Sequence, residues 1–90
     1  MNRNISISKS ADRFLSRVPR KHAAQIAKKI VALLEDPRPE DSISMKGSVF
    51  FRVDSGEYRI VYRFDNSTVF VSVIGKRNDG DVYRKAKRVE

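Results

Sequence analysis

The sequence predicts an α+β fold. Its expected elements are an N-terminal strand, a helical hairpin packed on a mainly antiparallel four-stranded sheet, and a short C-terminal helix. Residues 11–35 repeat apolar side chains three and four positions apart, which is the spacing of the buried face of a helix. Residues 49–75 instead alternate apolar and polar side chains and contain two turn signals, which is typical of consecutive β-hairpins.

The composition limits the size of the fold and the chemistry open to it. Ninety residues fit a single domain, which we expect to span 1–90. There is no cysteine and one histidine, His22, so disulfides, thiolate catalysis and a Cys/His zinc site are excluded. We expect neither a metal nor a cofactor. No run of eighteen apolar residues and no apolar leader is present, so we expect a cytoplasmic protein with no membrane segment.

The chain is strongly basic. Nineteen Lys and Arg against eleven Asp and Glu give a formal net charge of +8, and the excess is spread over both halves of the sequence. On so small a surface, this charge favours a polyanion or an acidic protein as the partner. The plainer alternative is a positively charged surface that only confers solubility.

Residues 4–35 carry the signals of a strand and two helices. Asn4–Ser8 alternates isoleucine with polar residues and predicts a short strand, after which Ser8 or Ser10 can cap a helix. Pro19 suits the first turn of a second helix, predicted from about Arg20 to Glu35. The two apolar stripes comprise Ala11, Phe14, Leu15 and Val18, and then Ala23, Ile26, Ala27, Ile30, Leu33 and Leu34. His22, in the first turn of the second helix, is expected at the surface.

A proline-rich segment and a connector separate the helices from the hairpins. Asp36 precedes Pro37, and a residue before proline is pushed out of the helical region, so the helix ends there. The connector runs through Glu40–Gly47. Beyond the hairpins, Asp81–Val89 is expected to form the short C-terminal helix.

The two hairpins have a register that the turns and the alternation predict. The expected strands are Val49–Asp54, Glu57–Phe64 and Thr68–Gly75, with turns at Ser55-Gly56 and Asn66-Ser67. Strand pairs are predicted to be Arg52 with Arg59, Phe50 with Val61, Phe64 with Val69, Tyr62 with Val71, and Ile60 with Val73. One face then collects the core residues, including Tyr58 and Tyr62, and the other collects the arginines.

This register predicts a basic pocket at one end of the sheet. Arg52 lies directly beside Arg59, and two opposed cations repel, which a sequence shaped only for stability would avoid. Lys76 and Arg77 leave the last strand near the same end, and Tyr83 follows. Guanidinium groups grip phosphate oxygens bidentately, and a tyrosine ring can stack on a base. Because RNA carries its own nucleophile, the 2′-OH, such a pocket could cleave it without a metal.

Two stretches carry a family resemblance: EYRIVYRF, and VFVSVIGKRNDGDVY that follows it. Together with the segments LLEDPRPED and MKG, they resemble the RelE/ParE superfamily of bacterial toxins from type II toxin–antitoxin systems. The resemblance covers nearly the whole chain. It implies the RelE-like microbial RNase-type fold. The GKR…Y combination favours the RelE type, whose members cut mRNA in the ribosomal A site and inhibit translation.

The resemblance also implies roles for individual residues. In RelE-type members the catalytic set matches Arg52, Arg59, Arg77 and Tyr83. Arg59 would stabilise the scissile phosphate, Arg77 would orient it, and Tyr83 would stack on the base and accept the 2′-OH proton. The basic residues expected to bind substrate are Lys46, Lys76, Arg63 and Arg84. The implied partners are a neutralising antitoxin that co-represses its operon, the 70S ribosome and mRNA. The free toxin is expected as a monomer that assembles further with antitoxin.

One departure from the family pattern keeps other functions open. RelE itself carries a second lysine, proposed as proton donor, at the position matched here to Asp54. Lys46 or Lys76 could substitute for it. The alternatives are a ParE-type toxin that poisons DNA gyrase, and a catalytically inert relative that binds only RNA or an antitoxin.

Overall fold

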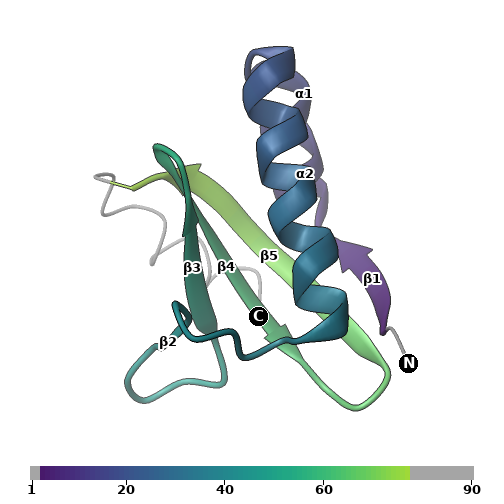
Figure 1. Cartoon of the computed structure of the whole chain (residues 1–90), viewed down its shortest axis with the longest axis vertical. Helices are drawn as coiled ribbons and strands as arrows, with labels where there is room; N and C mark the ends of the chain where they lie inside the picture. Colours follow the sequence, from purple (N-terminus) through teal and green to yellow (C-terminus); the bar gives the residue numbers. More distant parts are fainter. Residues whose placement is uncertain (1–2, 78–90) are drawn as a thin grey trace.

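The computed structural model describes residues 3–77, so the helix predicted at Asp81–Val89 lies outside the described residues. Two helices and a mixed sheet confirm the predicted α+β class (Figure 1). The elements in chain order are β1 (Asn4–Ile7), α1 (Lys9–Arg17), α2 (Arg20–Glu35), β2 (Ile43–Ser44), β3 (Phe51–Ser55), β4 (Tyr58–Phe64) and β5 (Thr68–Lys76).

The sheet has five strands in the order β1-β5-β4-β3-β2, one more than predicted. β1 runs parallel to β5, and the other neighbours are antiparallel. The additional strand, β2, consists of two residues inside the predicted connector and pairs Ile43 with Arg52. So short a strand has no alternation of its own, and therefore only its contact with β3 reveals it.

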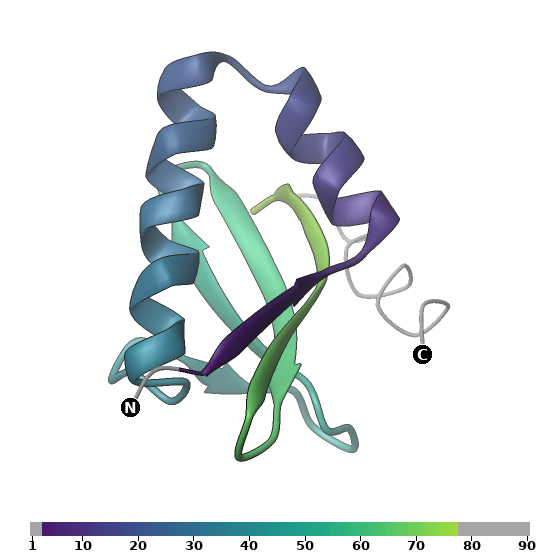
Figure 2. The ribbon, with the colours of Figure 1, turned by 90° about the vertical axis from the view of Figure 1, so that its right-hand side faces the viewer.

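Both helices lie on the same face of the sheet, joined by a short turn (Figures 1 and 2). Of the two predicted caps, Ser8 is the N-cap of α1, and its hydroxyl accepts a hydrogen bond from the Ala11 backbone N–H at 3.1 Å. α1 ends because Val18, the residue before Pro19, has an extended backbone. Neither α1 nor α2 is long and apolar enough to cross a membrane.

The main core lies between the helices and this face of the sheet. α2 spans the residues predicted for it and buries Ile26, Ile30 and Leu33. These side chains pack with the apolar face of the hairpins, on which Tyr58 and Tyr62 are buried as predicted. The cluster comprises Ala11, Ile26, Ile30, Leu33, Val53, Tyr58, Ile60, Tyr62, Val69, Val71 and Ile74. The hairpins thus pack one face against the helices, and their opposite face carries a smaller buried cluster together with the arginines.

The register between β3 and β4 differs from the prediction by two residues. Arg52 faces Val61, and Asp54 faces Arg59, so Arg52 and Arg59 are diagonal neighbours and not directly opposed. The turn consists of Gly56 and Glu57, and Gly56 takes a positive φ of 59°, as the first central residue of a type II′ turn does. A shift of two residues keeps every side chain on its predicted face, so the alternation alone could not distinguish the two registers.

A β-bulge in β5 corrects a second predicted pairing. Val61 faces Val73 and Tyr62 faces Val71, which leaves Ser72 as the extra residue. Ser8 supports the bulge, because its N–H donates to the Val71 carbonyl at 3.0 Å and its hydroxyl donates to the Ser72 carbonyl at 2.6 Å. Beyond the bulge the faces exchange. Ile60 therefore pairs with Ile74, not with Val73, and Val73 joins Phe50 and Val61 in a smaller cluster on the opposite face.

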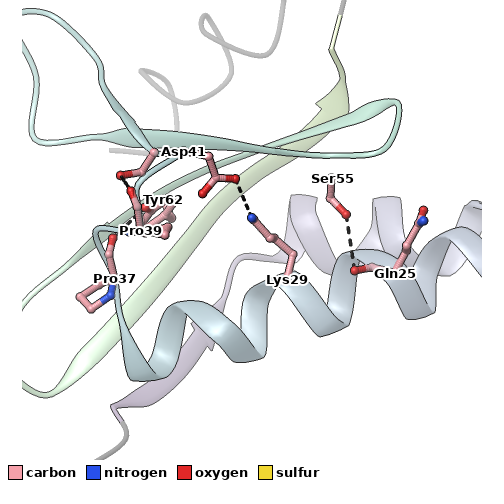
Figure 3. Close-up of polar contacts among 8 residues, drawn as sticks. Gln25, Lys29, Pro37, Pro39, Asp41, Ser55 and Tyr62 are labelled. Atoms are coloured by element: carbon pink, nitrogen blue, oxygen red, sulfur yellow. Dashed lines mark hydrogen bonds and ion pairs between the residues drawn. The ribbon is translucent and has the colours of Figure 1, made fainter.

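Polar contacts fasten α2 and the proline-rich segment to the sheet (Figure 3). Lys29 donates to the Asp41 carboxylate at 2.6 Å, and the Ser55 hydroxyl donates to the Gln25 carbonyl at 3.4 Å. The buried Tyr62 hydroxyl donates to the Pro37 carbonyl at 2.7 Å. These contacts fix the position of the β3–β4 hairpin relative to α2.

The buried Tyr62 predicts a loss of stability at high pH. Burial raises the pKa of Tyr62 from 10.0 to about 12. Between pH 10 and 12 the tyrosine ionises in the unfolded chain but not in the folded one, so the unfolded state binds fewer protons. This residue's contribution is complete below pH 10. It should fall by up to about 1.4 kcal/mol per pH unit as the pH rises towards 12.

Urea unfolding of the wild type and Tyr62→Phe at pH 9, 10, 11 and 12 measures this contribution. At pH 9 the variant should be less stable by about 1–3 kcal/mol, because the Pro37 carbonyl loses its donor. The difference between the two proteins should then shrink at higher pH. A difference that stays constant from pH 9 to 12 would contradict the assignment.

Candidate functional site

The tip of the β3–β4 hairpin and the end of β5 hold a cluster of two arginines around one carboxylate. Arg59 Nε lies 2.9 Å from Asp54 Oδ1, and Arg77 Nε lies 3.4 Å from Asp54 Oδ2. The three residues, called the arginine cluster below, come from β4, β3 and the residue after β5. The structure thus brings Arg59 and Arg77 together, as the sequence predicts.

Local backbone contacts place each member of the arginine cluster. Asp54 and Arg59 face each other across the hairpin, and Arg59 faces Gly75 on its other side, where no side chain competes for space. The Arg77 N–H donates to the Glu57 carbonyl at 3.0 Å, and its guanidinium donates to the Gly56 carbonyl at 3.4 Å. The turn therefore fixes the residue after β5 as well as the hairpin.

The two arginines differ in their access to solvent. The Arg59 side chain is 15% exposed, whereas those of Arg77 and Asp54 are 55% and 39% exposed. Arg59 is thus a largely immobilised donor at the base of the site, and Arg77 is a donor at its rim. A planar guanidinium in each position can grip the oxygens of an anion bidentately.

Arg52 lies on the same face of the sheet, two residues before Asp54. It pairs with Ile43 on one side and Val61 on the other, so it adds positive charge beside the arginine cluster without opposing Arg59 directly. The expected like-charge pair is therefore replaced by an attractive pair, Asp54 with Arg59. The physical reason is the position of the turn, which moves each β3 residue two places along β4.

Asp54 holds the arginines and is not arranged as a proton donor. Each of its carboxylate oxygens lies close to a guanidinium nitrogen, one of Arg59 and one of Arg77. A phosphate approaching Arg59 and Arg77 would compete with Asp54 for the same donors.

The other predicted site residues fall elsewhere. Lys76 faces Tyr58 and so belongs by register to the helix-covered face. Lys46 is exposed in the loop after β2. Arg63 lies at the far end of the arginine face, with its guanidinium 4.0 Å from the centre of the Phe70 ring. The predicted Tyr83 and Arg84 lie outside the described residues. In residues 3–77, no group of three or more His, Asp or Glu side chains is arranged to hold a metal ion.

His22 corrects a further expectation, because it is half-buried and not a surface residue. Its Nδ1 lies 2.7 Å from the hydroxyl of Tyr58, the residue before Arg59. The Phe14 ring meets Tyr58 edge-on, with centroids 5.8 Å apart. The sequence did carry a signal for this contact, since His22 lies four residues before Ile26 and so continues the buried stripe of α2.

Comparisons with known proteins bear on the fold and the family of the chain. Residues 5–80 match the family model described as the ParE toxin of the type II toxin–antitoxin system parDE. A mutant of the E. coli toxin RelE in the free state is 25% identical, with a TM-score of 0.84 over 98% of this chain and 97% of that chain. No curated protein sequence matches the chain.

Two toxin–antitoxin complexes are also similar. The intact E. coli RelBE complex contains a chain 25% identical, with a TM-score of 0.73 over 86% of this chain and 99% of that chain. An archaeal RelE–RelB complex from Pyrococcus horikoshii is 20% identical, with a TM-score of 0.75 over 89% and 100% of the two chains, and is alike in fold.

Proposed function

Because the chain belongs to the RelE/ParE superfamily of toxins from type II toxin–antitoxin systems, we propose that it is a ribosome-dependent endoribonuclease that cuts mRNA in the A site. The observation that carries this proposal is the arginine cluster. Two guanidiniums that converge on the carboxylate of Asp54 would converge equally well on a phosphate. The net charge of +8 supports a polyanionic substrate.

The proposed reaction uses the nucleophile that RNA carries. The 2′-oxygen attacks the adjacent phosphorus and the bond to the 5′-oxygen breaks, which leaves a 2′,3′-cyclic phosphate and a 5′-hydroxyl. Arg59, held in place at the base of the site, stabilises the charge that develops on the phosphate oxygens. Arg77 orients the phosphate from the rim, and Arg52 adds positive charge beside them. The family resemblance supplies Tyr83 as the residue that stacks on the base and accepts the 2′-OH proton.

Further basic residues are proposed to bind the RNA around this centre. Lys46 extends from the loop after β2, and Arg63 lies at the other end of the same face of the sheet. Lys76 and Arg84 are also proposed to bind the substrate, on the basis of the sequence alone. The leaving 5′-oxygen takes up a proton, for which Lys46 or Lys76 is the proposed donor in place of Asp54, whose carboxylate oxygens contact arginines.

A cognate antitoxin is the second proposed partner. The similar E. coli RelE chain was solved in complex with RelB, and we propose a comparable neutralising partner that also co-represses the operon. Several large apolar side chains of this chain are exposed and suit such a partner: Ile5, Ile7, Val31, Ile43 and Val49. The free toxin is proposed to be a cytoplasmic monomer.

Asp54 predicts a gain of RNA affinity when its charge is removed. Asp54→Asn keeps an oxygen that can accept from Arg59 but no longer competes with phosphate for the two guanidiniums. Binding of a labelled single-stranded RNA should tighten about five-fold, which corresponds to about 1 kcal/mol for a partly exposed ion pair. Fluorescence anisotropy at fixed salt measures this change. Glu40→Gln, the same charge change at an exposed residue, is the control, and an equal gain in both variants would refute the competition.

DNA gyrase is the alternative target, because the matching family model is that of ParE and the lysine expected at Asp54 is missing. Nucleic acids extracted from growth-arrested cells distinguish the two functions. The ribonuclease predicts mRNAs cut within codons, with DNA intact. The gyrase poison predicts DNA breaks and an SOS response, with mRNAs intact, and this second pattern would overturn the proposed function.

A further inference from the structure

An open cavity of about 220 Å³ lies between α1 and the end of β5. The described residues that line it are Ser10, Arg13, Phe14, Arg17 and Ile74. Ile74 belongs to the helix-side core, so the cavity opens on the other side of the sheet from the arginine cluster. Ile74 also precedes Gly75, which faces Arg59, so the cavity and the arginine cluster lie at the same end of β5.

The two arginines of the cavity have no acidic partner among the described residues. Arg13 and Arg17 are one turn apart on α1, where like charges repel and destabilise a helix. Both are exposed, and within residues 3–77 neither guanidinium has a hydrogen bond or an ion pair. Among the described residues, no acidic side chain lines the cavity. Arg17 gains from the helix dipole in the last turn of α1, whereas for Arg13 no described contact offsets this repulsion.

Aromatic packing fixes the position of Phe14, one of the residues that line the cavity. Phe14 meets Tyr58 edge-on at an interplanar angle of 76°, and the Tyr58 hydroxyl lies 2.7 Å from His22. Ile74 is only 3% exposed. The cavity is therefore formed before any ligand arrives. Its volume is below the range of about 300–1,000 Å³ typical of small-molecule sites, so it suits one group of a larger ligand.

We propose that this cavity binds a phosphate group of an RNA backbone and gives the toxin a second RNA contact outside the arginine cluster. Arg13 and Arg17 donate to the phosphate oxygens from one side, and Phe14 and Ile74 face the sugar. RNA is favoured over an acidic peptide because one polyanion can reach both sites at this end of β5. The inference rests on the proposed RNA-directed function and deepens it by locating a second substrate contact.

The test compares the salt dependence of RNA binding in matched variants. Arg13→Gln/Arg17→Gln removes both donors, and Lys21→Gln/Lys28→Gln removes two exposed charges from α2. Each protein is titrated from 50 to 300 mM KCl against a labelled single-stranded RNA and, separately, against 70S ribosomes with a vacant A site. The slope of log affinity against log salt should fall by about 0.7 to 1 in Arg13→Gln/Arg17→Gln, the change expected for the loss of one phosphate contact, and much less in the control.

Each outcome decides the proposal. A reduced slope in the RNA titration alone, or in the ribosome titration as well, supports it and identifies which RNA supplies the phosphate. Slopes equal to the wild type in both titrations overturn it, as does a wild type that binds neither RNA. Far-UV circular dichroism and thermal unfolding verify that both double variants are folded. A reduced slope without mRNA cleavage would overturn the proposed function alone, and cleavage with an unchanged slope would overturn this inference alone.

Discussion

Arg59→Gln is expected to lower the rate of mRNA cleavage about 100- to 1,000-fold and to abolish growth arrest. The loss follows from the position of Arg59 at the base of the arginine cluster, where its guanidinium is held by Asp54 and only 15% of the side chain is exposed. A donor fixed in this way stabilises developing charge without first reorganising, which is worth about 3–4 kcal/mol in comparable oxyanion sites. Single-turnover cleavage of a defined mRNA on 70S ribosomes measures the effect.

Two controls make this result specific to the site. Arg20→Gln removes the same charge from an exposed position at the start of α2 and should leave the rate within about three-fold of the wild type. The unfolding curve of Arg59→Gln should match that of the wild type within about 1 kcal/mol, because the ion pair is only partly buried. Cleavage by a folded Arg59→Gln protein at the wild-type rate would remove Arg59 from the mechanism.

Leu33→Ala is expected to be the most destabilising of the substitutions considered, at about 2–5 kcal/mol. Leu33 is fully buried on the face of α2 that packs against the sheet, so its truncation loses apolar contacts and leaves a cavity. A domain of this size has a free energy of unfolding of about 5–15 kcal/mol, so the variant would approach unfolding at physiological temperature. Urea denaturation at pH 7 measures the loss.

Val31→Ala is the matched control on the same helix. Val31 is 58% exposed and lies outside the core cluster, so its truncation should change the free energy of unfolding by no more than about 0.5 kcal/mol. Similar losses in Leu33→Ala and Val31→Ala would contradict the assignment of the buried face of α2.

The sequence predicts the helices well because their signals are local. The stripe of Ile26, Ile30 and Leu33, bounded by Pro19 and Pro37, determines α2 without reference to the rest of the chain. The cap at Ser8 is local in the same way. His22 continues the stripe, but its contact with Tyr58 depends on a residue 36 positions away.

The hairpins show what local patterns leave open. Alternation determines which face a strand residue occupies, and these faces are right for Arg52, Asp54 and Arg59. It does not determine register, because a shift of two residues preserves every face. The bulge at Ser72 is beyond local inference for another reason. Its carbonyl is satisfied by Ser8, which lies 64 residues earlier, so the exchange of Val73 and Ile74 between faces depends on a tertiary contact.

The candidate site was accessible from the sequence in part. The convergence of Arg59 and Arg77 at one end of the sheet is correct, because both follow from strand order and strand length. Their partner, Asp54, could not be predicted in the same way. The family pattern has a lysine at this position, so from the sequence alone Asp54 indicates only that the proposed proton donor is missing. With the observed register it becomes the residue that holds both guanidiniums in place.

The most direct test of the account is cleavage of a defined mRNA by purified toxin, with and without 70S ribosomes programmed with that mRNA. The proposed ribonuclease predicts cuts only in the ribosomal A site, products that end in a 2′,3′-cyclic phosphate and a 5′-hydroxyl, and cleavage by Arg59→Gln that is about 100- to 1,000-fold slower. Intact mRNA on programmed ribosomes, together with gyrase-dependent DNA breaks produced by the same protein, would contradict it.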